Sequence, residues 1–407
     1  MTPPALRFTV LAVALSALLT GCRGTHAPPV SLEAVPATEL RRAKSNVRVF
    51  DAAWSCIADE YYDRTLRGVD WDAAGRKYGP QAAAAADDRA LYDVLNEMLG
   101  LLGDRHTFAR TPAEAAERQS RTSTRIGLAV GSVDGKWVVT EVVSPSPAES
   151  AGVKPGWILV AHNGRPVEDE SGPLPQEGQI DTWDFLDEKD QPRRLSIPMQ
   201  TLSTRPVHHV RVLPSGIVVV RFDEFDSSEQ RWLDAQIEAH QAAPALVLDL
   251  RRNRGGELDS LVAAIGLFFD DPSACGRLVT RRGGRIERST RPCKTAHYRG
   301  PMAVLVDRTT ASAAEILAAV LQEQKRATIV GRKTRGAVLG SGDIPLPDGG
   351  EIQVSGLDYA TPGGRRLDGE GVVPDVETPF TLADFRTGAD PDLDAALRVL
   401  GVARVRR

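Results

Sequence analysis

The strongest constraint on the fold is a set of short, almost uninterrupted apolar runs in the second half of the chain. They cover residues 245–250, 302–306 and 327–330. Between them lie segments whose apolar residues recur three and four apart, as on one face of a helix. A strand that is apolar on both faces must be covered on both faces, which favours a parallel sheet with helical crossovers. The pattern therefore predicts an α/β layer from about residue 206 onward.

Length and charge limit the remaining possibilities. A chain of 407 residues is too long for one core, so two or three domains are expected. Lys and Arg number 50 against 54 Asp and Glu, which gives a formal charge of -4. There is no basic surplus to indicate a nucleic-acid partner and no acidic run typical of a disordered tail.

The first 22 residues have the pattern of an export signal. Arg7 is followed by an apolar run at residues 8–19 and by the sequence LTGC, which ends at Cys22. This run is too short to cross about 30 Å of hydrocarbon, so a cleaved signal at residues 1–21 is expected. LTGC resembles the bacterial lipoprotein box, which implies that Cys22 becomes the lipidated first residue of the mature protein. The alternative is a plain secretory signal with a chance cysteine.

The lipoprotein interpretation predicts a membrane-anchored protein of the bacterial cell envelope that faces the periplasm. Arg23 stands where some bacteria place the aspartate that retains a lipoprotein at the inner membrane, which favours the outer membrane. Residues 22–44 are rich in Pro, Ala and Thr without an apolar period, as expected of a flexible tether.

Three other cysteines would share this oxidising compartment. Cys56 lies among helical apolar positions and is interpreted as a buried thiol. Cys275 and Cys293 bracket a strand-like segment with a turn at Gly283 and Gly284, a pattern compatible with a hairpin disulfide. The sequence contains no CxxC pair and no HExxH, so neither a metal nor another cofactor is expected.

A helical region is predicted at residues 45–120. Apolar residues recur three and four apart in two places there. They are Val47, Phe50, Trp54, Ile57 and Tyr61, followed later by Leu91, Leu95, Met98 and Leu102. The second helix is predicted to end at residues 100–103, which include two glycines. The sequence DRHT at residues 104–107 then falls on a loop.

Residues 121–205 read as short strands and turns. Their order is IGLAV at 126–130, WVVTEVV at 137–143, SPSPA at 144–148 and AGVKPG at 151–156. This order resembles a PDZ domain, which implies that backbone N–H groups at Gly127, Leu128 and Ala129 bind the carboxylate of a peptide C-terminus. Trp157 departs from the PDZ pattern, which usually has Asp after Pro-Gly. The alternative is a small β module without a ligand.

Four segments beyond residue 206 match one family in order. They are DLRxNxGG at 249–256, TASAAEI at 310–316, VGxxTxG at 330–336, and TPGG with GVVPD at 361–375. Together with the preceding regions they resemble the S41 peptidases, the group of the C-terminal processing proteases and the tricorn core. The resemblance implies an α/β fold: a crotonase-like or ClpP-like catalytic core at residues 206–385, an inserted PDZ-like domain, and a C-terminal tail at residues 386–407.

Ser312 stands between an apolar strand and a helix, where its hydroxyl would meet the positive helix end. Both an N-cap serine and a nucleophile suit that position. Gly255 and Gly256 could bring bare N–H groups close to a ligand or simply make a turn. The resemblance implies that Ser312 is the nucleophile and that one of the two glycines forms an oxyanion hole with Ala313.

A serine nucleophile needs a base. The processing proteases place a lysine in a Thr-x-Gly-Lys-Gly segment, but the aligned segment here reads TRGAV at residues 334–338. Resemblance to the tricorn branch instead implies His106 as the base and Asp368 as its acidic partner. Arg105 replaces the serine of the tricorn pattern, and Asp368 replaces a glutamate. Glu370 and Lys333 are the alternative acid and base, at less suitable positions.

Together, these expectations predict a serine-type endopeptidase that hydrolyses proteins presented by their C-terminal tails. The alternative is a catalytically inactive, peptide-binding lipoprotein on the same fold, with the missing lysine and Arg105 as signs of decay. A crotonase-type acyl-CoA enzyme is less favoured, because the sequence carries no CoA-binding signal and export removes the protein from CoA.

Overall fold

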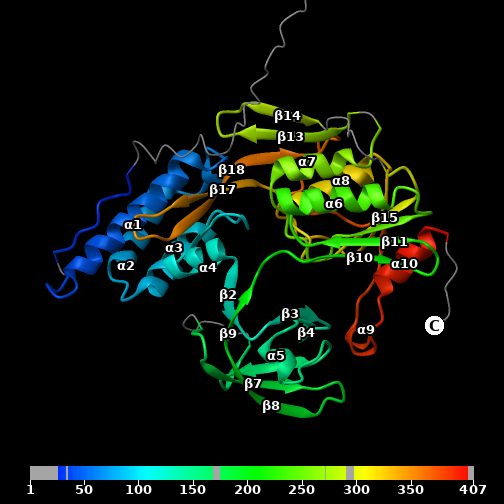
Figure 1. Ribbon diagram of the computed structural model, residues 1–407. Helices are drawn as coiled ribbons and strands as arrows, with labels where there is room; N and C mark the ends of the chain where they lie inside the picture. The colour runs from blue at the N-terminus through cyan, green and yellow to red at the C-terminus, as the bar shows by residue number, and fades with distance from the viewer. Residues whose placement is uncertain (1–25, 34, 168–174, 271, 290–297, 402–407) are drawn as a thin grey trace, which may run out of the picture. The chain divides into compact units, whose positions relative to one another are not determined.

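The computed structural model describes residues 26–33, 35–167, 175–270, 272–289 and 298–401, which divide into two units (Figure 1). The first unit comprises the described residues up to Ala113 together with residues 340–357, and the second comprises the rest. Residues 1–21, Cys22 and Cys293 lie outside the described residues. Within the described part of the chain, no helix combines the length and apolarity that a membrane crossing requires.

The first unit packs helices against a small antiparallel sheet. Its helices are α1 (Leu40–Glu60), α2 (Trp71–Ala83) and α3 (Asp88–Gly100), with the 3-10 turn η2 (Leu66–Gly68) after α1. Strand β18 (Glu351–Ala360) pairs with both β1 (Phe108–Arg110) and β17 (Gly340–Pro345). The predicted apolar face of α3 is buried, whereas Val47 on α1 is only half-buried and Val49 is buried instead.

Residues 340–357, which include most of the β17–β18 hairpin, belong to the first unit, whereas the sequence analysis expects the catalytic core at residues 206–385. Ile352 and Val354 belong to the same buried cluster as Leu95 and Met98 of α3. Phe108 pairs with Gln353, far away in the chain. A pairing between such distant segments leaves no local sequence pattern, so the sequence alone does not predict it.

A β module, residues 122–203, forms part of the second unit and follows helix α4 (Pro112–Ser120). Strand β2 (Thr122–Arg125) pairs with β9 (Gln200–Ser203). The module's sheet has the order β3 (Leu128–Val133), β4 (Lys136–Val142), β5 (Ile158–His162), β7 (Ile180–Leu186) and β8 (Pro192–Pro198), with β6 (Arg165–Pro166) beside β5. The short helix α5 (Pro147–Ser150) packs against it through Ala148, which belongs to the same buried cluster as Val139 and Phe185. Strand β3 therefore lies at an edge of this sheet.

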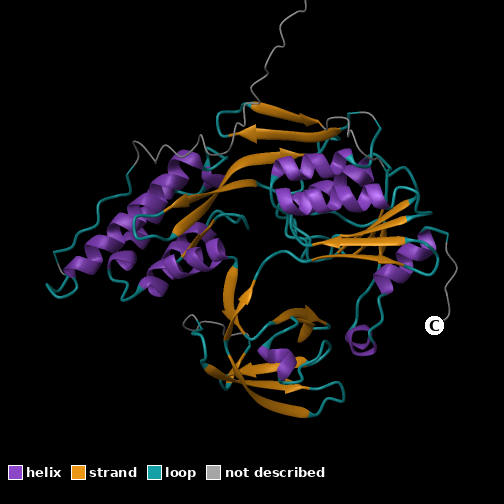
Figure 2. Ribbon diagram, viewed as in Figure 1, coloured by secondary structure: helices purple, strands orange, loops and turns teal. Residues whose placement is uncertain are grey.

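The main sheet of the second unit confirms the predicted α/β layer. Its order is β10 (His208–Val212), β11 (Val218–Phe222), β12 (Leu246–Asp249), β15 (Met302–Val306), β16 (Thr328–Gly331) and β19 (Val376–Glu377). All neighbours are parallel except β10 and β11. Helices α6 (Ser227–Ala239), α7 (Leu258–Gly266) and α8 (Ala313–Glu323) gather on one face (Figures 1 and 2).

The predicted hairpin between Cys275 and Cys293 is confirmed as β13 (Ala274–Thr280) and β14 (Arg285–Ser289). Cys275 is buried, and its Sγ lies 3.6 Å from the carbonyl oxygen of Ser273. Because Cys293 lies outside the described residues, the disulfide stays a prediction.

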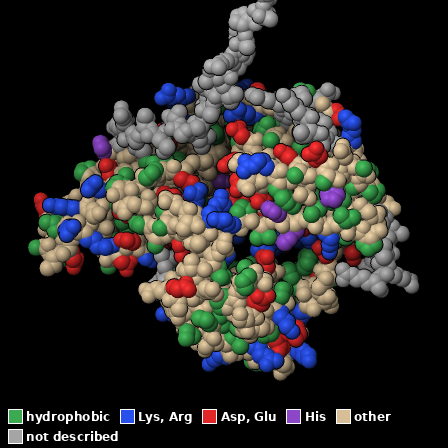
Figure 3. All heavy atoms as spheres, viewed as in Figure 1, with side chains coloured by type: hydrophobic (Ala, Val, Ile, Leu, Met, Phe, Trp, Pro, Cys, Tyr) green, Lys and Arg blue, Asp and Glu red, His purple; other side chains and the backbone are tan. Residues whose placement is uncertain are grey.

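On the face shown in Figure 3, acidic and basic side chains are interspersed, as their near-equal numbers predict.

The C-terminal segment is helical where the sequence analysis assigns a tail from residue 386. After α9 (Leu382–Thr387), helix α10 (Pro391–Val399) buries Ala395 and Ala396 against Val247 and Leu305 of the main sheet. The helical period in this segment is real but covers little more than two turns, which is too short for a firm prediction.

An ion-pair network attaches α10 to the main sheet. Asp390 caps the helix by accepting the N–H of Leu393 at 3.0 Å, and it pairs with Arg251 at 2.8 Å. Arg251 also pairs with Asp249 at the end of β12, at 2.7 Å. Burial opposes ionisation of Asp390, but Arg251 outweighs it and holds the pKa of Asp390 below its usual range.

We expect Asp390→Asn to destabilise the protein in a pH-dependent way, because asparagine keeps the helix cap but removes the charge. A folded-state pKa below the unfolded value contributes stability that is present above about pH 4 and is lost as the pH falls through the folded pKa. The difference in unfolding free energy between wild type and variant should thus be flat near neutral pH and shrink in acid. Urea unfolding across the pH range measures it, and a difference that grows in acid would contradict the assignment.

Candidate active site

Ser312 lies at the junction of β15 and α8 in an unusual backbone conformation. Its φ is 55° and its ψ is -123°, and it is half-buried. The preceding loop is tied to the neighbouring turn, since Thr310 Oγ1 donates to the Leu250 carbonyl at 2.9 Å and the Ala311 N–H donates to the Asn253 carbonyl at 3.0 Å. Such a conformation costs about 1–3 kcal/mol in a non-glycine residue and must be held by its surroundings.

The turn after β12 lies directly against Ser312. Asn253 is fully buried, and its Nδ2 donates to the Phe222 carbonyl at 2.9 Å. A Cβ on Gly255 would lie 2.5 Å from the Ser312 Cβ, and a Cβ on Gly256 would lie 2.1 Å from the Phe225 carbonyl oxygen. Both positions also have positive φ, so this close backbone approach requires glycine.

The two glycines differ in what their N–H groups do. The N–H of Gly255 donates to Asn253 Oδ1 at 2.9 Å. In the described residues, neither Gly256 nor Ala313 donates its N–H to a protein acceptor. Ala313 is the first residue of α8, where N–H groups are unpaired within the helix and the helix dipole is positive. Gly256 and Ala313 are therefore the donors that a ligand oxygen beside Ser312 could use.

The buried carboxylate of Glu315 holds the Ser312 turn to a second loop. Its Oε2 accepts the N–H groups of Ser312 at 3.0 Å and Ala337 at 2.9 Å. Its Oε1 accepts the N–H of Gly336 at 2.7 Å and the hydroxyl of Thr334. The Ser312 N–H also donates to the Ala337 carbonyl at 2.8 Å. Burial raises the pKa of Glu315, although these hydrogen bonds favour its charged form.

Asp368 lies on a turn that docks onto this second loop. The Gly369 N–H donates to the Gly336 carbonyl at 2.8 Å, and the Val372 N–H donates to Thr334 Oγ1 at 2.7 Å. The side chain of Asp368 is half-buried. The structure thus brings the Asp368 turn to the loop that holds Ser312.

Ala337, the residue that the sequence analysis aligns with the expected lysine, is buried beside Ser312. Lys333, the alternative base, lies on the same loop but is exposed. Glu370, the alternative acid, is also exposed.

His106 lies in the first unit, whereas Ser312 and Asp368 lie in the second. The His106 N–H donates to Asp104 Oδ1 at 2.8 Å, and the His106 carbonyl accepts from Gln353 Nε2 at 2.9 Å. Gln353 is itself fixed by Arg110, whose Nη2 donates to Gln353 Oε1 at 2.9 Å. The loop that carries His106 is therefore clamped on both sides of the histidine.

Gly127, Leu128 and Ala129 lie at the start of β3, the edge strand of the β module. Gly127 has φ 87°, and its carbonyl accepts the N–H of Val143 at 2.8 Å. Among the strands of the described residues, Leu128 and Ala129 pair with Val142 and Glu141 of β4 on one side only. An edge strand of this kind can pair with an additional strand.

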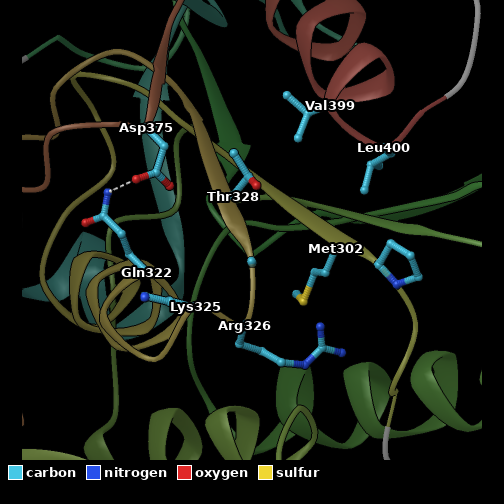
Figure 4. Close-up of a pocket in the computed structure, with 10 residues that line it drawn as sticks. Met302, Gln322, Lys325, Arg326, Thr328, Asp375, Val399 and Leu400 are labelled. Carbon is cyan, nitrogen blue, oxygen red and sulfur yellow. Dashed lines mark hydrogen bonds between the residues drawn. The ribbon is translucent and has the colours of Figure 1, made fainter.

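A separate cavity of about 390 Å³ lies at the opposite end of α8 from Ser312 (Figure 4). Gln322 and Asp375 are hydrogen-bonded on its wall, as the figure shows, at 2.9 Å. The guanidinium group of Arg326 donates hydrogen bonds to main-chain carbonyls, among them that of Phe268, which accepts from Arg326 Nε at 2.8 Å. Its lining contains none of the residues that the sequence analysis selects. Among the described residues, no group of three or more His, Cys, Asp or Glu side chains could hold a metal ion.

Two family models match parts of the chain. Residues 216–378 match the family model of peptidase family S41, and residues 44–100 match that of the tricorn protease C1 domain. The chain carries a peptidase family S41 domain. The match to the S41 domain spans the turn at Gly255, the nucleophile candidate Ser312 and the loop at Asp368.

Proteins similar to this chain include processing proteases and a tricorn protease homolog. A carboxyl-terminal-processing protease of Picosynechococcus sp. is 29% identical over 368 residues, which cover 86% of this chain and 87% of that protein. A tricorn protease homolog of Streptomyces coelicolor is 26% identical over 400 residues, or 90% of this chain. The chain spans only 32% of that longer relative.

Solved structures agree on the fold. The photosystem II D1 C-terminal processing protease superposes with a TM-score of 0.61 at 25% identity, covering 88% of this chain and 97% of that one. The tricorn protease superposes with a TM-score of 0.53 at 18% identity, covering 88% of this chain and 36% of that one. The α/β fold of the S41 core is therefore confirmed.

Sequence reasoning missed the residues that support the site. Asn253, Glu315 and Thr334 all lie inside the motifs at residues 249–256, 310–316 and 330–336, but the sequence analysis assigns them no role. A signal existed for Glu315, because a glutamate three residues after a serine at a helix start is the capping-box pattern. The contacts of Asn253 and Thr334 depend on segments that meet only in the fold.

Gly255→Ala should abolish the reactivity of Ser312 while the chain still folds. The added Cβ would meet the Ser312 Cβ at 2.5 Å and would also be strained at φ 95°. We expect a loss of at least about 100-fold in the rate of labelling by a serine-directed phosphonate, similar to removal of an oxyanion-hole donor. Gly283→Ala is the control, because its φ is also positive but nothing lies within 4 Å of the new Cβ. Equal labelling of the two variants would contradict the assigned contact.

Glu315→Gln should loosen both loops of the site. The glutamine amide nitrogen would face two donors where the carboxylate now accepts, so at least one buried N–H would lose its partner at a cost of about 1–3 kcal/mol. Urea unfolding and phosphonate labelling should both show the loss. Glu323→Gln is the control, since Glu323 lies on the same helix and accepts the Gly363 N–H at 3.0 Å near the other end. A smaller loss for Glu315→Gln than for Glu323→Gln would overturn the role of Glu315.

Proposed function

We propose that this S41 chain is a serine endopeptidase with Ser312 as its nucleophile. The observation that carries the proposal is the backbone of Ser312, which an ordinary cap serine does not need. Ser146 provides the contrast in the same chain: it caps α5 with φ -157° and ψ 162°, and its Oγ accepts the Glu149 N–H at 3.1 Å. Ser312 instead adopts a strained conformation beside two available N–H groups.

Gly256 and Ala313 form the oxyanion hole in this proposal. Both N–H groups are available among the described residues, and Ala313 adds the positive end of α8. Gly255, the other glycine that the sequence analysis considers, has a different task. Its N–H is committed to Asn253, and its missing Cβ makes room for Ser312.

His106 acts as the general base, and Asp368 supports it. This assignment rests on resemblance to the tricorn branch and on Ala337, which places a methyl group where the processing proteases have their lysine. The clamped His106 loop is the kind of rigid support that a base requires. Arg105, next to it, is exposed.

The reaction is hydrolytic acyl transfer. His106 accepts the proton of the Ser312 hydroxyl as Ser312 Oγ attacks the peptide carbonyl, and Gly256 and Ala313 donate to the resulting oxyanion. His106 then protonates the leaving amine. Water, activated in the same way, hydrolyses the acyl-enzyme and restores Ser312.

The substrates in this proposal are proteins presented by their C-terminal tails. The name of the processing-protease relatives supports this class, and so does the open edge of β3 in the β module. A tail would add a strand to β3, while the N–H groups at Gly127, Leu128 and Ala129 bind its carboxylate, as in a PDZ domain. Lipidation at Cys22 would hold the enzyme at the bacterial envelope, facing the periplasm, with the outer membrane favoured.

The deciding test compares wild type, Ser312→Ala and His106→Ala, each as the soluble chain from Arg23 onward. The substrate is an unfolded protein with an apolar C-terminal tail, supplied with either a free or an amidated C-terminus. We expect wild type to cleave it, with Ser312→Ala and His106→Ala each reducing kcat by at least about 10⁴-fold, because nucleophile and base act as a unit. Amidation should raise KM. His209→Ala is the control, since His209 is exposed on β10.

Other outcomes separate the alternatives. Full activity in His106→Ala, with none in Ser312→Ala, would remove His106 as the base and bring Lys333 back into consideration. Tail binding without cleavage by any variant would favour the inactive peptide-binding lipoprotein, with the absence of lysine at position 337 as the physical reason.

A further inference from the structure

Asp392, on the first turn of α10, is a fully buried carboxylate with two guanidinium partners. Its Oδ1 accepts from Arg332 Nη1 at 2.7 Å, and its Oδ2 accepts from Arg332 Nη2 at 3.0 Å and from Arg251 Nη1 at 3.1 Å. The hydroxyl of Thr378 also donates to it. A buried carboxylate with this many charge-assisted hydrogen bonds fixes the geometry of every group it binds.

The two arginines stand at the start of the two loops that build the candidate site. Arg251 follows β12 and leads into the turn of Asn253 and Gly255. Arg332 follows β16 and leads into the loop whose N–H groups bind Glu315. Asp392 therefore connects the first residues of both loops to each other. It does so from α10, which packs on the main sheet.

The two arginines depend on Asp392 to different degrees. Arg251 keeps Asp249 at 2.7 Å and Asp390 at 2.8 Å if Asp392 is lost. Arg332 pairs in the described residues with Asp392, apart from a 3.4 Å contact to the Thr378 carbonyl and a position 5.2 Å from the Phe380 ring. Removing one partner of a buried ion pair leaves an uncompensated charge, so the loop after Arg332 should respond most.

We propose that Asp392 is a positioning residue for the S41 active site, acting through Arg251 and Arg332 on the oxyanion turn and on the loop that holds Ser312. This inference rests on the proposed function, because it assigns a purpose to loops whose chemistry is proposed above. It makes α10 a part of the site's support although none of its residues belongs to the proposed catalytic set.

The test uses Asp392→Asn in the full chain, with Leu393→Ala as its matched control. Leu393 lies on the same helix turn and packs on the apolar cluster under the sheet, so its truncation weakens the attachment of α10 without touching the ion pairs. Two measurements are made at equal fractions of folded protein: the rate of phosphonate labelling of Ser312 and hydrogen exchange of the backbone amides. Cleavage of the tailed substrate adds kcat and KM.

We expect Asp392→Asn to slow labelling and lower kcat by about 10- to 100-fold with KM unchanged, since misplacement of the reacting groups carries costs of this size. Exchange should rise at residues 250–256 and 332–337. Leu393→Ala should change labelling by less than about twofold, with exchange rising in α10 alone. The proposal is overturned if both variants lose reactivity equally, or if the exchange changes in Asp392→Asn stay within α10.

A second variant covers the case in which Asp392→Asn does not fold. Arg332→Lys keeps a positive charge but loses the bidentate geometry, so it should release residues 332–337 and leave 250–256 protected. Exchange that rises equally in both segments would contradict separate arms of one network. Because exchange needs no activity, wild type that neither cleaves nor reacts with the phosphonate would sink the proposed function alone, and the exchange pattern would still decide whether Asp392 holds the loops.

Discussion

The buried carboxylate of Glu315 is the interaction on which the geometry of the candidate site depends. It accepts hydrogen bonds from Ser312, Thr334, Gly336 and Ala337, so one side chain fixes the Ser312 turn and the loop beside it. Burial alone would favour the neutral acid, and it does raise the pKa of Glu315. Two oxygens that each accept two bonds nevertheless suit a carboxylate better than a carboxylic acid, whose proton would face one of these donors. The strain at Ser312 can persist because this contact and the packing of α8 surround it.

The different contacts of Gly255 and Gly256 follow from the same close packing. Asn253 uses both ends of its amide, one toward Phe222 and one toward Gly255. That leaves Gly255 as the residue that lets Ser312 approach and Gly256 as the one with an available N–H. A side chain on either glycine would collide with its surroundings, so their presence has a steric reason that does not depend on any enzymatic role.

Local sequence patterns predicted the strands, the helices and the main motifs. They did not predict contacts between segments that are distant in the chain. Apolar runs and helical periods indicated the parallel sheet and α8, and the motifs placed Ser312 beside Gly255. The pairing of β18 with β1 was not predicted, because the two strands, with Phe108 on β1, are far apart in sequence. Asp392 was assigned to a tail because its helix is short, and its value appears only when Arg251 and Arg332 converge on it. The residues that support the candidate site are therefore harder to predict from the sequence than the candidate catalytic residues.

At position 337, where resemblance to the processing proteases implies a lysine, alanine leaves the Ser312 turn intact for a simple reason. At this position the backbone does the structural work: the Ala337 N–H binds Glu315 and its carbonyl accepts the Ser312 N–H. The side chain takes no part in either bond, so these two bonds do not require a lysine at this position. The backbone contacts that hold Ser312 are thus independent of a lysine at position 337. In the function proposed above, the base must then come from another segment, and His106 is the residue proposed for that role.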